Sequence, residues 1–275
     1  MREKRMNKVP VNLNINNRQL TMTFDQTSPV HRMIIGELQS AGAYEIASQL
    51  FLTRVLRDGD TFIDVGAHIG YFTMLSAAIV GEQGKVIAIE PIEENFRQLK
   101  QHIAVNELTW VEAVQTVISD TDGEIDIHFN ADNDGGHALW DPGTHPHNVL
   151  SRENPRSEHV ASCRLATLMA EHSVEKVRLM KIDTEGAEAM ILGSSRDFFI
   201  NGGVEFIIME INFSGLRNMG SDVDALFALA RDLGFIICLP QENGTAPMLL
   251  ANDNLPEQRY VYNVVLARPD ALNSL

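Results

Sequence analysis

The alternation of apolar and polar positions divides the chain into strands and helices. Residues 9–24 alternate on both sides of an Asn-rich turn at residues 16–19, which is typical of a β-hairpin. Residues 31–56 are expected to be largely helical, because apolar positions recur at helical spacing in their second half. In the rest of the chain, short apolar runs of strand length alternate with helical stretches. This order predicts an α/β domain with a mostly parallel sheet.

Residues 61–91 form the clearest unit: an apolar strand, a glycine turn, an amphipathic helix and a second apolar strand. The turn runs from Gly66 to Gly70, directly after Asp64, and Glu90 closes the second strand. Parallel strands joined by a helix end at the same edge of a sheet, where open α/β sheets bind their ligands. Glu90 follows the turn by about 20 residues, a position from which a carboxylate accepts hydrogen bonds from ribose hydroxyls.

The form of the turn restricts the ligand. A dinucleotide site would need a further glycine where this chain has His68, whose side chain would obstruct a pyrophosphate. The sequence also contains no Gly-Lys-Ser/Thr phosphate loop. An NAD-dependent oxidoreductase is therefore disfavoured, and we expect a nucleoside without phosphates. S-adenosylmethionine is such a ligand, with its ribose on Glu90 and its methionine tail over the glycine turn.

Later strands bring further polar residues to the same edge. The third strand, expected at residues 110–118, ends at Ser119 and Asp120. Asp120 could reach the adenine amino group, or it could belong to a plain turn, because residues 120–123 are strong turn formers. The two interpretations are weighed evenly.

Two acids mark the ends of the next strands. The fourth parallel strand, residues 174–183, ends at Asp183, and the fifth carries Glu210 at its exit. A strand-ending acid at the ligand edge is seldom needed for the core, so Asp183 is a candidate for contact with the reacting group. Glu185 and Glu188 are expected in the first turn of the following helix, where the helix dipole is a sufficient structural reason for both.

Residues 131–159 form the least regular stretch of the chain. A long loop without secondary structure is usually functional or disordered, so we expect a lid over the acceptor site. His137 follows two glycines and is the candidate general base, since imidazole commonly accepts protons near neutral pH. The alternative is a surface loop whose histidines have no role. For His145 and His147 that alternative is favoured over a metal site.

Composition places the chain among ordinary globular proteins. It has 275 residues and a net charge of 22 − 37 = −15, which argues against nucleic acid or a membrane surface as partner. Cys163 and Cys238 are expected to be reduced thiols, and neither a signal peptide nor an apolar segment of membrane-spanning length is present in the sequence. We expect a cytoplasmic protein that acts on a small-molecule acceptor, with a homodimer as an open alternative to a monomer.

Three segments resemble the FkbM-type S-adenosylmethionine-dependent methyltransferases. They read FIDVGAHIGYFT at residues 62–73, AIEP at residues 88–91 and MKIDTEGAE at residues 180–188. The resemblance implies a Rossmann-like class I methyltransferase fold: a seven-stranded, mostly parallel sheet with helices on both faces, here preceded by the β-hairpin. It also implies S-adenosylmethionine as methyl donor and, most often, O-methylation of a hydroxyl on a small molecule, sugar or natural-product scaffold.

The resemblance also assigns residues to the site. The residues implied to bind the cofactor are Tyr44, Glu45, Asp64, Gly66, His68, Gly70, Glu90, Ser119 and Asp120. The family usually has Asn at the position of His68, so the contact to the methionine end is an open point. The candidates for acceptor contact or general base are, in falling order of support, Asp183, Glu210 and His137.

The expected organisation is an N-terminal hairpin with a helical lead-in, residues 1–43, followed by the methyltransferase domain, residues 44–275, with the lid-like loop at 131–159. Three alternatives stay open. Asp183 and Glu210 could hold Mg²⁺ that activates the acceptor hydroxyl. The acceptor could be an amine. The chain could also bind a nucleoside without turnover.

Overall fold

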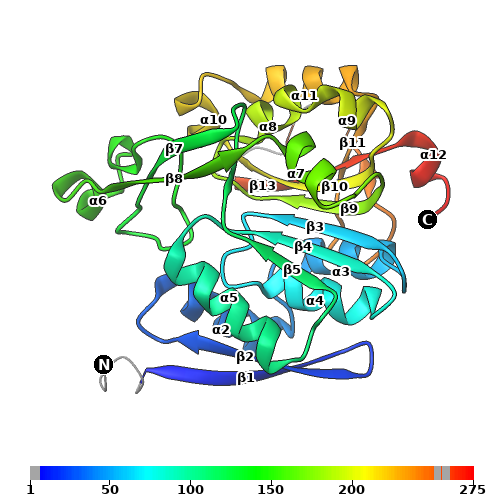
Figure 1. Cartoon of the computed structure of the whole chain (residues 1–275), viewed down its shortest axis with the longest axis horizontal. Helices are drawn as coiled ribbons and strands as arrows, with labels where there is room; N and C mark the ends of the chain where they lie inside the picture. The colour runs from blue at the N-terminus through cyan, green and yellow to red at the C-terminus, as the bar shows by residue number, and fades with distance from the viewer. Residues whose placement is uncertain (1–6, 251–254, 256–260) are drawn as a thin grey trace.

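The structure is a computed structural model that describes residues 7–250, 255 and 261–275. The first six residues of the expected N-terminal segment therefore lie outside the described part. A central sheet is covered by helices on both faces, and the hairpin and a smaller sheet flank it (Figure 1).

The central sheet has the strand order β12-β11-β13-β10-β9-β3-β4-β5. Its parallel strands are β3 (Thr61–Val65), β4 (Lys85–Ile89), β5 (Val111–Val114), β9 (Val177–Ile182) and β10 (Val204–Asn212). Strand β13 (Val261–Ala267) runs antiparallel between β10 and β11 (Ile236–Leu239). These strands make up the seven-stranded, mostly parallel sheet that the resemblance implies. The two-residue β12 (Met248–Leu249) adds a short eighth strand at the edge.

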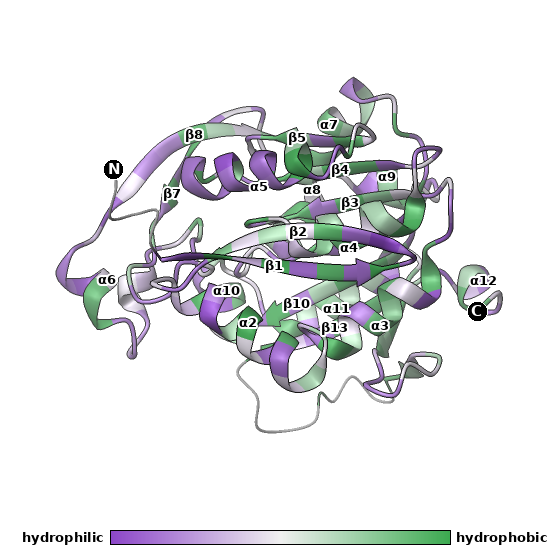
Figure 2. Ribbon diagram, turned by 90° about the horizontal axis from the view of Figure 1, so that it is seen from below, coloured by the Kyte–Doolittle hydropathy of each residue, from purple (hydrophilic) through white to green (hydrophobic). Residues whose placement is uncertain are grey.

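Helices cover both faces because the central strands are apolar on both sides. The first face carries α2 (Pro29–Ala41), α3 (Ile46–Val55), α4 (Tyr71–Val80) and α5 (Glu93–Val105). The second carries α7 (Leu165–Glu171), α8 (Glu188–Ser194), α9 (Arg196–Ile200), α10 (Phe213–Asn218) and α11 (Val223–Asp232). Figure 2 shows the strands β4 and β10 as largely apolar and α5 as more hydrophilic. The short α12 (Pro269–Leu272) follows β13.

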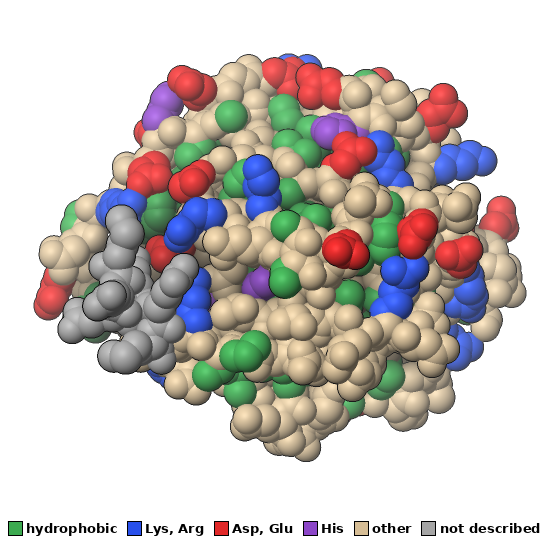
Figure 3. All heavy atoms as spheres, turned by 60° about the horizontal axis from the view of Figure 1, so that its bottom comes forward, with side chains coloured by type: hydrophobic (Ala, Val, Ile, Leu, Met, Phe, Trp, Pro, Cys, Tyr) green, Lys and Arg blue, Asp and Glu red, His purple; other side chains and the backbone are tan. Residues whose placement is uncertain are grey.

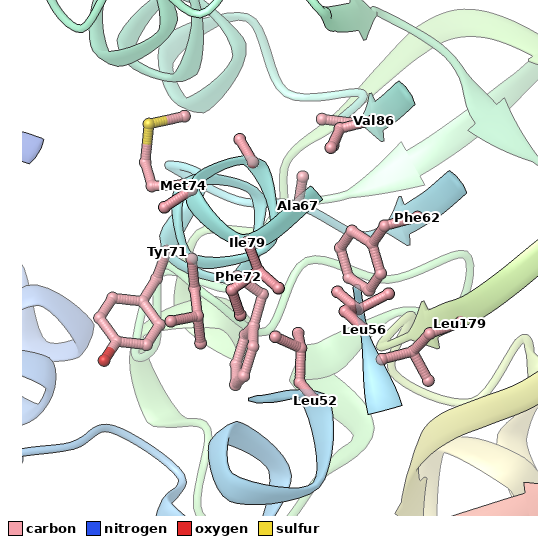
Figure 4. Packing of buried hydrophobic residues seen from close by; sticks show 14 of the residues in the cluster. Leu52, Leu56, Phe62, Ala67, Tyr71, Phe72, Met74, Ile79, Val86 and Leu179 are labelled. Carbon is pink, nitrogen blue, oxygen red and sulfur yellow. The ribbon is translucent and has the colours of Figure 1, made fainter. Parts of the chain in front are cut away.

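Neighbouring residues of a strand pack into two separate hydrophobic cores, because successive side chains point to opposite faces of the sheet. Phe62 packs with the first set of helices, whereas Ile63 packs with the second. In Figure 4, Leu52, Leu56, Phe62 and Phe72 gather on the first face, and Leu179 reaches the same cluster from β9. All ten residues of α4 are buried, so this helix fixes the glycine turn that precedes it.

The predicted hairpin is confirmed as β1 (Lys8–Ile15) and β2 (Arg18–Asp25). Asn16 and Asn17 have φ of 47° and 63°, the left-handed pair that a two-residue hairpin turn requires. The hairpin packs on helices, because Thr23 N donates to Nε2 of His102 in α5 at 2.9 Å. It thereby closes the outer side of the first helical layer.

The chain does not return to the central sheet at residues 157–163. Strand β8 (Ser157–Cys163) pairs instead with β7 (Gly123–His128) and β6 (Val117–Ile118) in a separate three-stranded sheet. Most side chains of β7 and β8 are exposed or half-buried, which suits a ribbon at the surface and not a central strand. The third predicted strand is likewise broken, since β5 ends at Val114 and β6 belongs to the small sheet.

The stretch 131–159 also has more structure than its sequence predicts. It contains the 3₁₀-helix η1 (Pro142–Thr144), helix α6 (Val149–Glu153) and the first residues of β8. Asn130 and Asp132 organise it, because their side-chain oxygens accept hydrogen bonds from backbone N–H groups and from the Ser151 hydroxyl. Its helix α6 projects at one end of the molecule, next to β7 and β8 (Figure 1).

Acidic and basic side chains are interspersed on the face shown in Figure 3. Among the helices of the described ranges, none combines the length and the apolar character that crossing a membrane demands.

Candidate active site

A cavity of about 470 Å³ lies at the carboxyl ends of β3, β4, β9 and β10. Helix α2 and residues 133–139 contribute to its wall from outside the sheet. The cavity brings together nine of the residues that the sequence singles out: Tyr44, Glu45, Asp64, Gly66, His68, Glu90, His137, Asp183 and Glu210. Gly70, Ser119 and Asp120 are not part of its wall.

The glycine turn fits closely against the end of β9. Gly66 has φ of 84°, and a Cβ at this position would overlap the carbonyl oxygen of Asp183. The amides of Gly66 and Ala67 both donate to the carbonyl of Ile89, at 3.0 and 2.9 Å. Gly70 has φ of 91° and begins α4, and a Cβ there would overlap the Leu99 side chain. Gly70 therefore serves packing in this structure.

Glu90 lies at the tip of β4, facing the turn. Its Oε2 accepts a hydrogen bond from His68 N at 2.8 Å, and its Oε1 accepts one from Ile92 N at 2.9 Å. The side chain is 4% exposed, and burial raises its pKa to about 7 despite these two bonds. The backbone thus fixes this carboxyl at the cavity wall.

Ser119 and Asp120 lie just beyond the cavity. Ile118 belongs to the wall, whereas Ser119 bonds to the carbonyl of Thr121 and Asp120 is exposed. The carbonyl of Asp120 accepts a hydrogen bond from Nε of Arg164. The central strand ends at Val114, and residues 116–118 line this end of the cavity. Ser119 and Asp120, which were expected there, do not.

Lys181 in β9 is surrounded by acids. Its Nζ lies 2.5 Å from Oδ2 of Asp183 and 4.0 Å from Oε1 of Glu45, and it sits 4.7 Å from the ring centroid of Phe72. Burial disfavours the charge, but Asp183 and Glu45 outweigh that effect and raise the pKa of Lys181 above its ordinary value. The ammonium group therefore stays charged at the centre of the acidic cluster.

The acid within β3 has a different partner. Asp64 is 1% exposed and accepts a hydrogen bond from the Thr73 hydroxyl at 2.6 Å. Burial raises its pKa to about 6, against the opposing effects of Lys181 and Thr73. Thr73 lies in α4, so this bond joins the helix after the glycine turn to the strand before it.

Glu45, Asp183 and Glu210 converge on the other side of Lys181. One carboxylate oxygen from each lies within 4.8 Å of the other two. Glu45 accepts a hydrogen bond from Nδ2 of Asn263 at 2.9 Å, and Asn263 pairs with Glu210 across β13 and β10. Burial, followed by Asp183 and Glu185, raises the pKa of Glu210 well above its ordinary value. Three hard oxygen ligands at this spacing could also hold a divalent cation.

Glu185 is a cavity residue that the sequence reasoning missed. Helix α8 begins only at Glu188, and Glu185 has φ of 57°, so its expected place in the first helical turn is wrong. Its Oε2 accepts from Nδ2 of Asn212 at 2.6 Å, and its carbonyl accepts from Nε1 of Trp140 at 2.7 Å. Burial, with the charge of Asp183, raises the pKa of Glu185 to about 8.

The signal for Glu185 was the glycine that follows it. Gly186 has φ of 111°, and a Cβ there would overlap the backbone of Gly215. The close approach forces an irregular turn between β9 and α8, which turns Glu185 into the cavity. Glu188 does lie in the first turn, where Oε1 accepts from the Thr184 hydroxyl and the Gly186 amide.

His137 reaches the cavity from the segment after β7. Its Nδ1 accepts a hydrogen bond from Asn130 N at 3.0 Å, and burial lowers its pKa to about 4. A group with this pKa is a weak proton acceptor at neutral pH. The rings of His145 and His147 contact each other in a tilted arrangement, with centroids 5.5 Å apart, and lie outside the cavity wall.

The cavity suits a nucleoside with a cationic tail. The fixed carboxyl of Glu90 lines one part of it, a tight turn lets a ligand approach the backbone, and acids surround the space beyond the turn. The fold is a Rossmann-like α/β fold, with an acid-lined cavity at the carboxyl edge of its central sheet.

Sequence comparison gives the family. The profile of the methyltransferase FkbM domain matches residues 64–237, and the chain belongs to this family. No curated protein matches the chain significantly.

Solved structures show a weaker likeness. The chain is 11% identical to precorrin-6y C5,15-methyltransferase of Geobacter metallireducens, with a TM-score of 0.42 over 81% of this chain and 86% of that one. It is 13% identical to an S-adenosylmethionine-dependent O-methyltransferase of Thermotoga maritima, with a TM-score of 0.43 over 86% and 71%. It is also 13% identical to Aeropyrum pernix fibrillarin with bound S-adenosylmethionine, with a TM-score of 0.40 over 78% and 68%. The family assignment rests on the sequence profile alone.

Proposed function

We propose that the protein transfers the methyl group of S-adenosylmethionine to a hydroxyl group of a small molecule, a sugar or a natural-product scaffold. The observation that carries this proposal is Glu210, a carboxyl with a raised pKa that lines the same cavity as Glu90 and Asp183. A hydroxyl must lose a proton when it is methylated, and a carboxyl of raised pKa is a better proton acceptor than an ordinary one.

The cofactor would lie along the carboxyl edge of the sheet. Glu90 would accept hydrogen bonds from the ribose hydroxyls, and the methionine part would lie over the Gly66 turn between His68 and Glu45. Tyr44 and Asp64 would complete the wall at this end, consistent with their places in the cavity. Contact of adenine with Ser119 and Asp120 stays a prediction, supported by the position of Ser119 one residue beyond the wall.

The reaction is an in-line displacement at the sulfonium methyl. The acceptor oxygen forms a bond to the methyl carbon, the bond from carbon to sulfur breaks, and S-adenosylhomocysteine leaves. The hydroxyl proton would pass to the carboxylate of Glu210. Asp183 is already paired with Lys181, and His137 has a low pKa, so both are better suited to orient the acceptor than to take its proton.

A metal-assisted reaction is the second candidate, favoured by the convergence of Glu45, Asp183 and Glu210. A divalent cation held by these oxygens would lower the pKa of an acceptor hydroxyl. The ammonium of Lys181 already supplies a positive charge beside two of these acids. This resident charge supports the metal-independent form.

The proposal can be tested with S-adenosylmethionine that carries a deuterated methyl group. The protein is incubated with a panel of sugars, polyketides and hydroxy acids, and labelled products are located by mass spectrometry. We expect a labelled methyl ether, a rate at least about a hundredfold lower in Glu210→Gln, and unchanged binding of S-adenosylmethionine in that variant. Label on nitrogen, or full activity in Glu210→Gln, would contradict the proposal. Activity lost on prolonged chelation and restored by Mg²⁺ would establish the metal-assisted form.

We propose three further properties that accompany this function. Residues 1–43 would cover the methyltransferase domain of residues 44–275, supported by the packing of β2 on α5. A cytoplasmic location is supported by the free thiols of Cys163 and Cys238. The net charge of −15 favours a small acceptor over nucleic acid or a membrane, with a monomer or a homodimer as the assembly.

A further inference from the structure

Two histidine rings meet beside the cofactor cavity. His31 comes from α2 and His68 from the glycine turn, and their ring centroids lie 5.5 Å apart at an interplanar angle of 67°. The Nε2 atoms of both rings are buried and have no hydrogen-bond partner. Together with a carboxylate oxygen of Asp134, ring nitrogens of both residues lie within 4.8 Å of one another. Buried polar groups without a partner are rare and call for an explanation.

The tautomer of His31 is fixed by its surroundings. Its Nδ1 accepts a hydrogen bond from Asp25 N at 2.8 Å, the side chain is 3% exposed, and burial lowers its pKa, so the ring is neutral. A neutral imidazole carries one hydrogen, which must then lie on Nε2. His31 therefore offers a buried N–H donor to its neighbours.

This tautomer excludes a metal ion as the partner. A metal bound to Nε2 of His31 needs the lone pair on that atom, and the hydrogen would have to move to Nδ1. There it would face the N–H of Asp25 at 2.8 Å, whereas ligating histidines donate their second N–H to an acceptor.

We propose that one water accepts the Nε2 hydrogen of His31 and donates to Nε2 of His68, and that the N–H thus fixed on Nδ1 of His68 binds the α-carboxylate of S-adenosylmethionine. His68 lines the cavity while its Nε2 is enclosed, so the ring edge that carries Nδ1 is the one left to face the ligand. Burial holds the pKa of His68 at about 3, so its ring is neutral and has one hydrogen to place. The inference rests on the proposed position of the methionine part over the glycine turn.

The charge distribution of the cavity supports this orientation. One part of its wall holds a single ammonium group and an excess of carboxyls, contributed by Glu45, Asp64, Asp183, Glu185, Glu210 and Lys181. Those of the acids that are ionised attract the ammonium and sulfonium groups of the cofactor and repel its carboxylate. The carboxylate is the cofactor's one anionic group, and a neutral N–H donor is well suited to it.

The residues around His68 are compatible with a bound carboxylate. Nδ1 of His137 accepts from Asn130 N, so that neutral ring carries its hydrogen on Nε2 and adds a second donor to the wall. Asp134 is the one acid in the pair's immediate group, but it does not line the cavity, and its Oδ1 accepts from Val30 N at 3.3 Å.

The backbone at His68 is consistent with a functional role. Its φ is 52°, in the left-handed region that few residues other than glycine adopt. Asn is among the residues that tolerate this conformation, but its side chain is too short to replace an imidazole between His31 and the cavity. Strain of this kind is typical of ligand sites.

The first experiment compares two ligands that differ in the carboxylate alone, S-adenosylmethionine and its decarboxylated form, by calorimetry. The variant His68→Phe keeps a ring but removes its nitrogens. We expect it to bind S-adenosylmethionine at least about tenfold more weakly than the native protein does. Binding of the decarboxylated ligand should stay within about twofold of the native protein. The control His147→Phe alters a histidine outside the cavity and should change neither ligand.

An equal loss of affinity for both ligands in His68→Phe would overturn the inference. The ring would then be needed for the shape of the turn and not for contact with the carboxylate. If the native protein binds neither ligand, the proposed cofactor site fails and this inference fails with it. If the native protein binds both ligands equally well, the cofactor site stands and the carboxylate contact is refuted.

The second experiment reads the tautomer directly. Long-range proton–nitrogen NMR spectra of the nitrogen-15-labelled protein should show the hydrogen of His68 on Nδ1. His31→Asn keeps an acceptor for the Asp25 amide and removes the Nε2 donor, so His68 should shift toward the other tautomer and S-adenosylmethionine should bind more weakly. A native His68 with its hydrogen on Nε2 would refute the role of His31. Thermal unfolding of each variant shows whether the fold is retained.

Discussion

Nζ of Lys181 lies 2.5 Å from Oδ2 of Asp183, at the point where β9 ends and the cavity begins. Lys181 lies inside the sheet and Asp183 just beyond it, so the ion pair joins the core to the site. Asp64 pairs with Lys181 in the β3–β9 register, which places a second acid beside the same ammonium. The cavity can hold several carboxyls because one buried cation offsets part of their repulsion.

Lys181→Met should therefore destabilise the protein strongly. The variant leaves Asp183, Glu45 and Asp64 without their shared cation, and removing one partner of a buried pair costs about 3 kcal/mol or more. Urea unfolding followed by fluorescence measures the free energy of unfolding. Lys176→Met removes an exposed lysine just before β9 and should change this free energy by less than about 0.5 kcal/mol. Equal stabilities of the two variants would refute the role given to Lys181.

Stability should fall as the pH rises above about 6.5. Burial raises the pKa values of Glu90 and Glu188 to about 7 and that of Glu185 to about 8, whereas in the unfolded chain each is near 4.5. The folded protein thus holds more protons, and its stability decreases until these carboxyls have ionised. Below about pH 6.5 the buried neutral histidines act in the opposite sense, since His68 and His137 have lowered pKa values.

Thermal unfolding between pH 5 and 9 checks this pattern. The melting temperature should be highest near pH 6 and lower at pH 8.5, and Glu188→Gln, which mimics the protonated acid, should flatten the decline. A melting temperature that increases steadily from pH 6.5 to 8.5 would show that these carboxyls are ionised in the folded protein.

Glu90→Gln should weaken binding of S-adenosylmethionine by about tenfold or more. The reason is that hydrogen bonds from ribose hydroxyls are stronger to a carboxylate than to a neutral amide. Calorimetry at pH 8, where the native carboxyl is largely ionised, measures the effect. Glu93→Gln changes an exposed acid in the first turn of α5 and serves as the control. Unchanged affinity in Glu90→Gln would remove the ribose assignment.

Gly66→Ala should disrupt the site, since the added methyl would overlap the Asp183 carbonyl and the φ of 84° disfavours alanine. We expect a loss of at least about 3 kcal/mol in unfolding free energy, or insoluble protein. Gly59→Ala is the matched control: its φ is 85°, but nothing lies within 4 Å of the added carbon. It should cost only about 1 kcal/mol. Similar losses in the two variants would mean that φ alone is responsible.

The strand–turn–helix–strand unit was predictable because its information is local. The apolar runs of β3 and β4, the glycines of the turn and the position of Glu90 are set by neighbours in the sequence. The hairpin was equally accessible, since Asn16 and Asn17 suit the left-handed turn between two alternating strands. Parallel-sheet geometry then brought Asp183 and Glu210 to the same edge.

The sequence alone thus determined the sheet, the class of cofactor and the acids at the strand tips, because periodicity and spacing fix the order of the elements and the edge at which each strand ends. Only the tertiary structure decided which polar groups face the cavity. Glu185 turns inward because Gly186 packs against Gly215, and Ser119 lies outside because the chain leaves the central sheet after Val114. His31 meets His68 through the packing of α2 on the turn. Such contacts join residues far apart in the chain, so no local pattern records them.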